Sequence, residues 1–189
     1  MTPFELRAPL ETERLVLRGL TEADVDAVHA HQSLPEVARY TLYEPRTRAE
    51  VADWVARHRT PRRLERDGDY LQLAVERRSD GRVIGDLYFS LRSAANATAE
   101  LGWTLHPEAQ GAGYATEGAR ALLGLAFETL ALHRVVAELD PRNVASARLC
   151  ERLGMRHEAH LVENEWFKGE WTDEDDFALL RQEWSAHDA

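Results

Sequence analysis

The sequence predicts an α/β fold of the α+β kind, in which a mostly antiparallel sheet carries inserted helices. Two strand-like runs, 69–77 and 82–91, are joined by a Ser-Asp-Gly turn that favours a tight hairpin. A long segment whose apolar residues recur every three or four positions then stands between two further strand-like runs, 98–106 and 133–140. The centre of the sheet is therefore predicted to be strand, helix, strand.

The N-terminal part predicts one strand followed by two helices. In residues 14–20 the apolar Leu15 and Leu17 alternate and a glycine follows at position 19, which indicates a first strand. Thr21 and Asp24 have the spacing of a capping box, and Thr47 and Glu50 form a better one. Each pair precedes a segment with apolar residues on one helical face, so we expect a helix after each.

The C-terminal part predicts one helix and two strands. Asn143 is placed to cap a helix that ends at Gly154. Residues 155–162 and 176–184 then indicate two more strands. The acidic tract 173–176 is expected to be a solvated turn between them, and it is also a candidate for attracting a cationic acceptor.

The composition argues against two classes of partner. The chain has 189 residues, 44% of them apolar, and no repeat or linker, so we expect one domain over residues 1–189. Its net charge is −10 and its 23 basic residues are scattered. This pattern argues against a nucleic-acid groove or an anionic membrane surface and suits a cationic substrate.

A cytoplasmic location is expected. No apolar run approaches the roughly 20 residues that span a bilayer, and the opening residues lack the apolar core of a signal peptide. The single cysteine, Cys150, has no partner for an internal disulfide, which agrees with a reducing compartment. The eight histidines lack the cysteine or carboxylate cluster that would complete a zinc site, so no metal is expected.

Two glycines, Gly111 and Gly113, stand directly before the long helix and indicate a phosphate ligand. Glycine lets a ligand approach the backbone, and a helix N-terminus presents free N–H groups to an anion. A dinucleotide fingerprint would need a third glycine where Thr116 stands, and a phosphate-binding P-loop would need a lysine after Gly118, where Ala119 stands. A simple turn is the remaining alternative.

Residues 110–115, Gln-Gly-Ala-Gly-Tyr-Ala, match the Q/R-x-x-G-x-G/A signature of GCN5-related N-acetyltransferases (GNAT), and the chain resembles that superfamily. Three further stretches, 10–24, 140–155 and 165–184, resemble its RimJ/RimL-like branch, which acetylates ribosomal proteins. The resemblance covers about residues 10–186.

The resemblance implies the GNAT fold, a twisted sheet of six to seven strands with splayed central parallel strands, and acetyl-CoA as cosubstrate. The amides of residues 111–115 would bind the pyrophosphate, and the pantetheine arm would lie between 98–106 and 133–139. The backbone of residues 103–105 would supply an N–H for the thioester oxygen. The expected coenzyme contacts are Trp103, Thr104, Leu105, Gln110, Gly111, Ala112, Gly113, Tyr114, Ala115, Thr116, Asn143, Ser146 and Cys150.

The family transfers the acetyl group by direct attack of an amine, which needs a general base and a proton for the departing thiolate. By resemblance to RimL-type endings, Glu165 is the first candidate base. Glu100, beside the expected thioester, is the second, and Asp86 is a weaker third. The alternative for Glu165 is a carboxylate that simply faces water at the edge of a turn.

The general acid departs from a common family pattern. Many members place a tyrosine seven residues after the asparagine that corresponds to Asn143, and Cys150 stands there. Ser146 occupies a position that carries a catalytic serine in RimL-like enzymes, so it inherits the role. Cys150 is a second candidate acid, and a buried thiol that only packs is the alternative.

The acceptor is expected to be a protein N-terminal α-amine, because an α-amine titrates at about 7.7–8.0 and a lysine amine at about 10.4. The alternatives are a small amine, such as an aminoglycoside or polyamine, and a catalytically silent sensor of coenzyme A. By resemblance to the family, a homodimer is also possible.

Overall fold

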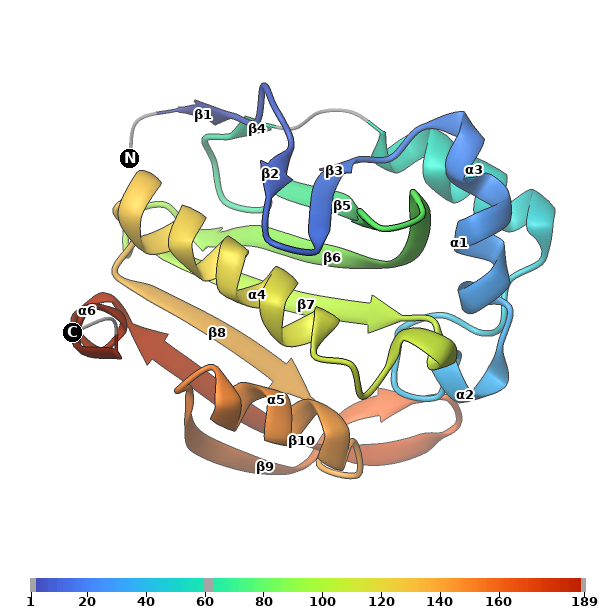
Figure 1. Ribbon diagram of the computed structural model, residues 1–189. Helices are drawn as coiled ribbons and strands as arrows, with labels where there is room; N and C mark the ends of the chain where they lie inside the picture. Colours follow the sequence, from blue (N-terminus) through green and yellow to red (C-terminus); the bar gives the residue numbers. More distant parts are fainter. Residues whose placement is uncertain (1–2, 60–62, 188–189) are drawn as a thin grey trace.

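The computed structural model describes residues 3–59 and 63–187, and its main feature is a mixed sheet with the order β2-β3-β5-β6-β7-β8-β10-β9 (Figure 1). Its strands are β2 (Leu10–Glu11), β3 (Leu15–Gly19), β5 (Tyr70–Arg77), β6 (Arg82–Ser93), β7 (Thr98–Leu105), β8 (Arg134–Leu139), β9 (Arg156–Phe167) and β10 (Glu170–Leu180). Among the described strands of this sheet, only β7 and β8 pair in parallel. The predicted mostly antiparallel sheet is confirmed. It has eight strands instead of six or seven because the short β2 adds to one edge.

A second, two-stranded sheet and several helices complete the described part of the chain. The small sheet pairs β1 (Phe4–Glu5) with β4 (Arg63–Leu64). The helices are η1 (Glu22–Asp24), α1 (Val25–Gln32), α2 (Pro35–Ala38), α3 (Arg48–His58), η2 (Pro107–Ala109), α4 (Tyr114–Gly124) with its π-helical end η3 (Leu125–Thr129), α5 (Val144–Arg152) and α6 (Arg181–His187). None of the helices within 3–59 and 63–187 is long and apolar enough to span a membrane.

The two predicted capping boxes are confirmed. The Asp24 carboxylate accepts a hydrogen bond from the backbone N–H of Thr21 at 2.7 Å. The Glu50 carboxylate accepts one from the backbone N–H of Thr47 at 2.8 Å, and the Thr47 hydroxyl accepts one from Glu50 N–H at 3.3 Å. These reciprocal bonds satisfy backbone groups that a helix start leaves free, which explains where η1 and α3 begin.

Helices cover both faces of the sheet. On one face α4 packs on β3, β6 and β7, and buries Ala119, Leu122 and Leu123 in the main core (Figure 1). On the other face α1 and α3 form a smaller cluster around Ala74 of β5. Alternation along β5 explains this division, since successive side chains of a strand point to opposite faces.

The C-terminal region differs from the prediction in two ways. The acidic tract 173–176 lies inside β10, and the turn is at Lys168 and Gly169 instead. The strand tolerates these carboxylates partly because His160 of β9 contacts Asp175 at 2.7 Å and Asp173 at 3.3 Å. The prediction relied on composition, which does not show cross-strand partners.

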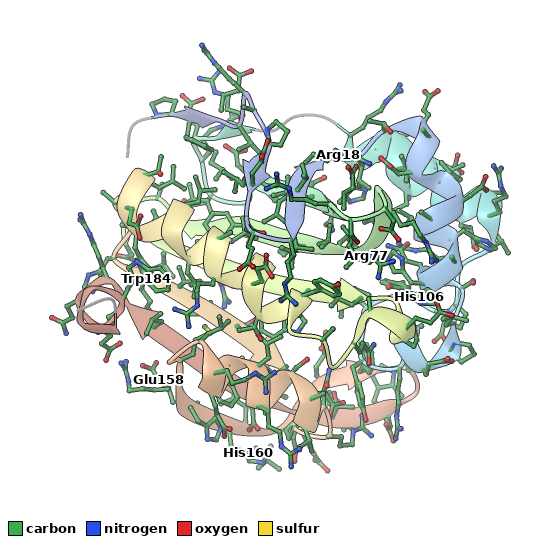
Figure 2. The ribbon with its side chains drawn as sticks, viewed as in Figure 1. Arg18, Arg77, His106, Glu158, His160 and Trp184 are labelled. Carbon is green, nitrogen blue, oxygen red and sulfur yellow. The ribbon has the colours of Figure 1, made fainter. Side chains whose placement is uncertain are left out.

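The predicted strand 176–184 ends at Leu180, and α6 follows. Trp184, which is labelled in Figure 2, belongs to α6. It packs on Phe127, with ring centroids 6.0 Å apart, and its Nε1 donates to Glu128 at 2.9 Å. These contacts hold Trp184 of α6 against η3, the π-helical end of α4.

The parallel strands β7 and β8 pair only at their beginnings. The pairing joins residues 98–100 of β7 to residues 134–136 of β8, and the two strands then diverge (Figure 1). This confirms the splayed central strands. On the side that faces β8, residues 101–105 of β7 therefore have no strand partner, which leaves room for an extended ligand to bind their backbone.

Candidate active site

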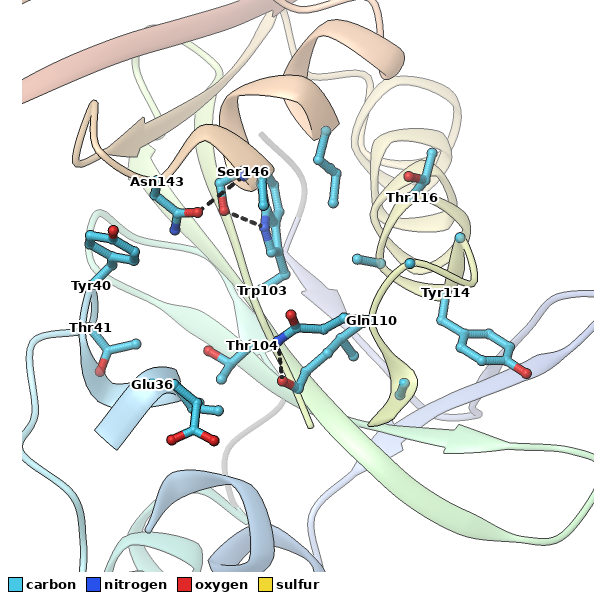
Figure 3. A pocket seen from close by; sticks show the side chains of 18 of the residues that line it. Glu36, Tyr40, Thr41, Trp103, Thr104, Gln110, Tyr114, Thr116, Asn143 and Ser146 are labelled. Carbon is cyan, nitrogen blue, oxygen red and sulfur yellow. Dashed lines mark hydrogen bonds between the residues drawn. The ribbon is translucent and has the colours of Figure 1, made fainter. Parts of the chain in front are cut away.

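A pocket of about 680 Å³ lies where β7 and β8 diverge (Figure 3). Its walls come from the end of β7, the glycine loop, the start of α4, α5 and the segment around α2. All the predicted coenzyme contacts except Ala112 and Cys150 line it.

The glycine loop presents unsatisfied main-chain amides to the pocket. Gly111 and Gly113 have φ angles of 74° and 84°, and Gly113 is the N-cap residue of α4 without a side-chain cap. Gln110 Nε2 donates to the Leu105 carbonyl at 3.1 Å and so fastens the loop to the end of β7 (Figure 3). The first N–H groups of a helix that lack a cap form a site for an anion.

A clamp that the sequence patterns did not reveal holds this loop in place. Arg14 Nη1 donates to the Ala112 carbonyl at 3.0 Å, and Arg14 Nε donates to Glu117 at 2.6 Å. Thr12 also donates to Glu117, at 2.6 Å. The loop is thus tied to the turn between β2 and β3, about a hundred residues away in sequence, and no local pattern could show this.

Arg152 is a second residue that the sequence analysis missed. It lies at the end of α5 and lines the pocket. Its Nε reaches the Thr116 hydroxyl at 3.5 Å. The guanidinium therefore adds a positive charge to the side of the pocket where the amides of α4 lie.

Ser146 is held in a defined orientation. Asn143 Oδ1 accepts the backbone N–H of Ser146 at 3.2 Å, which confirms the predicted helix cap. Trp103 Nε1 donates to the Ser146 hydroxyl oxygen at 3.1 Å (Figure 3). Because the oxygen accepts from the indole, the hydroxyl hydrogen of Ser146 is free to donate into the pocket.

Cys150 lies one helical turn after Ser146 but belongs to the core. Its side chain is fully buried and does not line the pocket. Burial raises the pKa of its thiol to about 12. The position therefore fits the packing alternative and not contact with a coenzyme in the pocket.

The three candidate bases lie in different surroundings, and none of them lines the pocket. Glu100 stands at the point where β7 and β8 part, on the face opposite the buried Ala99 and Leu101. Partial burial raises the pKa of Glu100, and the Arg92 guanidinium offsets part of the shift. Glu165 is exposed on β9, the outermost strand at that edge of the sheet.

Asp86, the third candidate base, is buried, and its carboxylate already contacts other side chains. Its carboxylate accepts from Gln72 Nε2 at 2.7 Å and contacts His31 Nε2 at 2.9 Å. These partners leave Asp86 little capacity to take a proton from a substrate, so its surroundings fit a supporting role.

Further acidic residues gather beside Glu100. Glu138 of β8 and Glu174 and Asp176 of β10 each have a carboxylate oxygen within 4.8 Å of those of the other two. Arg92 pairs with Glu138. Burial, followed by the charges of Asp176 and other carboxylates, raises the pKa of Glu174. This side of the sheet therefore has an electrostatic preference for cations.

The segment around α2 forms one wall of the pocket, and the sequence patterns did not indicate this wall. Glu36, Tyr40 and Thr41 lie across the pocket from Tyr114 and Thr116 (Figure 3). The Tyr40 hydroxyl donates to the Arg142 carbonyl at 3.2 Å. A four-residue helix is too short for a periodicity to predict it.

Comparisons with known proteins agree with this architecture. The family model for the acetyltransferase (GNAT) domain matches residues 14–156. The uncharacterised N-acetyltransferase YnaD of Bacillus subtilis is 30% identical over 177 residues, 93% of this chain and 99% of YnaD. The uncharacterised N-acetyltransferase p20 of Bacillus licheniformis is 31% identical over 176 residues, covering 93% and 98% of the two chains.

The solved structures agree as well. A crystal structure of a GNAT-family acetyltransferase from Bacillus anthracis superposes with a TM-score of 0.83 at 28% identity, covering 92% of this chain and 99% of that one. The family match includes the fork between β7 and β8 and the glycine loop. The chain therefore belongs to the GNAT acetyltransferase family, as an N-acetyltransferase that depends on acetyl-CoA.

Proposed function

We propose that the protein transfers the acetyl group of acetyl-CoA to a protein N-terminal α-amine, as a member of the RimJ/RimL-like branch. The observation that carries the proposal is the combination of free amides at the start of α4 with an unpaired strand edge in the same pocket. The amides of residues 113–115 would bind the pyrophosphate, with Arg152 beside them. The backbone of residues 103–105 would bind the pantetheine arm and the thioester oxygen.

In the proposed reaction the neutral amine attacks the thioester carbon, and the carbon–sulfur bond breaks. Ser146 gives its hydroxyl proton to the departing thiolate and regains a proton from solvent, so its hydroxyl is restored. Its oxygen already accepts from Trp103 at 3.1 Å, so its own hydrogen is available to the sulfur. This arrangement supports Ser146, and not Cys150, as the acid.

Of the candidate general bases, Glu100 has more suitable surroundings than Glu165. It lies at the fork, and partial burial raises its pKa, which makes it a stronger base than an exposed glutamate. Glu165 is exposed, on a strand separated from β7 by β10 and β8. In the proposed reaction Glu100 takes the proton that the amine loses, directly or through one water.

A small polycationic amine is the second candidate acceptor. The close carboxylates Glu138, Glu174 and Asp176 favour it, because several negative charges attract an amine with several positive ones. Some relatives are named for acetylation of ribosomal proteins and others for acetylation of a polyamine. YdaF of Bacillus subtilis is provisionally named a ribosomal N-acetyltransferase, and an Escherichia coli relative is named a spermidine N(1)-acetyltransferase.

A thiol-release assay with acetyl-CoA tests the proposal. The acceptor panel contains peptides with free N-termini, the same peptides with blocked N-termini, spermidine and an aminoglycoside. Turnover on the free peptides alone supports the main proposal, whereas turnover on spermidine or the aminoglycoside supports the second candidate. Binding of the coenzyme without turnover on any acceptor would refute both and indicate a silent sensor.

A further inference from the structure

The structure contains a buried tyrosine hydroxyl that has no hydrogen-bond partner among the described residues. Tyr43 lies in the segment between α2 and α3, and its Oη makes no hydrogen bond within 3–59 and 63–187. Orphaned buried hydroxyls are rare, because leaving one unpaired costs about 1–3 kcal/mol. A group of this kind calls for a functional explanation.

The position of the phenol is fixed by its neighbours. The Arg46 guanidinium stacks on the Tyr43 ring, 4.0 Å from its centroid, and Arg46 Nη1 donates to Gln32 at 2.6 Å. Lys168 Nζ, from the turn between β9 and β10, donates to the backbone carbonyl of Tyr43 at 2.8 Å. Arg46 therefore holds the face of the Tyr43 ring and Lys168 holds the Tyr43 backbone, so the orientation of the hydroxyl is fixed.

Tyr43 keeps its proton. Burial, followed by the negative charge of Asp86, raises the pKa of Tyr43 to about 12. The Tyr43 hydroxyl makes no hydrogen bond to Asp86, whose carboxylate contacts Gln72 and His31 instead. The phenol is thus a hydrogen-bond donor that needs another acceptor.

The hydroxyls of Thr41 and Thr104 are close enough to Tyr43 to lower its pKa. Neither of them makes a hydrogen bond with the Tyr43 hydroxyl. The Thr41 hydroxyl already donates to the Ala38 carbonyl at 3.1 Å. Thr104 lines the pocket on β7, opposite Asp86 in the register of β6 and β7. It stands within the backbone stretch that would bind the thioester.

We propose that the Thr104 hydroxyl is the contact that orients the acceptor amine, and that Tyr43 is the positioning residue for this hydroxyl. With substrates bound, Tyr43 donates to Thr104 Oγ1. The remaining lone pair of that oxygen accepts one N–H of the neutral amine, so the nitrogen lone pair points to the thioester carbon. This inference rests on the proposed function.

A double-mutant cycle of Thr104→Val and Tyr43→Phe tests the inference. The probes are an N-terminally free Ser-Ala-Gly peptide and spermidine, and the probe with the higher wild-type turnover is used. Each single variant should lower kcat/KM for the amine by about tenfold, the worth of one hydrogen bond, without changing the affinity for acetyl-CoA. Tyr43→Phe should cause almost no further loss in the Thr104→Val background, because the two hydroxyls act as one unit.

Two controls separate this role from a structural one. Tyr70→Phe removes a tyrosine hydroxyl from β5, outside this network, and should leave kcat/KM unchanged. Thr104→Ser keeps the hydroxyl and should retain most of the activity. If Tyr43→Phe lowers thermal stability and its effect adds to that of Thr104→Val, Tyr43 is only structural and the inference is wrong. A wild-type protein that acetylates neither probe would overturn the proposed function and this inference together.

Discussion

Replacement of Gly113 by alanine tests whether the main-chain amides at the start of α4 bind the coenzyme. Gly113 has a φ of 84°, in the left-handed region, and it lines the pocket. An added Cβ would lie 3.4 Å from Arg14 Nη2 and would meet no other atom within 4 Å. The main consequence of the substitution is therefore backbone strain.

The expected change in the free energy of unfolding of Gly113→Ala follows from two opposing effects. The left-handed conformation costs alanine about 1–2 kcal/mol, whereas the stiffer unfolded chain returns about 0.4–1 kcal/mol. The free energy of unfolding should thus fall by about 1 kcal/mol, which lowers Tm by about 2–4 °C in a chain of this size. If the free loop relaxes and binding must restore it, strain of about 1.4 kcal/mol raises the Kd about tenfold.

Calorimetric titration with acetyl-CoA and thermal unfolding measure the two effects, and Gly81→Ala is the matched control. Gly81 has a φ of 68° in the turn between β5 and β6, and an added Cβ there meets nothing within 4 Å. It should lose similar stability and keep the wild-type Kd. If Gly113→Ala loses less stability than Gly81→Ala, which shows that its free loop has relaxed, and still keeps the wild-type Kd, the amides do not bind the pyrophosphate and the reasoning is refuted.

Three further predictions concern the chemistry. Ser146→Ala should lower kcat about 100-fold, the usual worth of general acid catalysis, with the Kd for acetyl-CoA unchanged in calorimetry; an unchanged kcat would assign the acid elsewhere. Because the pKa of Glu100 is raised above its ordinary value of 4.5, kcat/KM should decline as pH falls through that raised value. Glu100→Gln should abolish this limb of the pH profile and Glu165→Gln should keep it; the opposite result would make Glu165 the base. The Cys150 thiol, with its pKa near 12, should resist iodoacetamide in the native protein and react in urea, as followed by mass spectrometry; native labelling at the rate of a free thiol would contradict its burial.

The features that the sequence predicted well depend on neighbours in the chain. Both capping boxes, the hairpin at Gly81 and the helix after Gly113 are local patterns, and the structure confirms them. The lining of the pocket was also largely predictable, since most of the residues expected there belong to β7, the glycine loop or the first turns of α4 and α5.

The features that the sequence did not predict depend on contacts between distant segments. Arg14 reaches Ala112 across 98 positions, and Lys168 reaches the Tyr43 carbonyl across 125. A periodicity or a motif describes one segment at a time, so neither contact leaves a signal in it. The acidic tract 173–176 was assigned to a turn for the same reason, because its histidine partner lies on another strand.

The negative charge of the chain explains why main-chain groups suit the proposed coenzyme site. A chain with a net charge of −10 has to bind the anionic phosphates of its cosubstrate. Amides fixed at a helix start attract an anion whatever the net charge, because salt screens more distant charges beyond about 8 Å. The carboxylates Glu138 and Asp176 alternate along their strands with core residues, so they lie on the other face of the sheet. In the proposed reaction the fork between β7 and β8 would join these two faces, so that an anionic donor and a polycationic acceptor would meet there while the sheet keeps their binding groups apart.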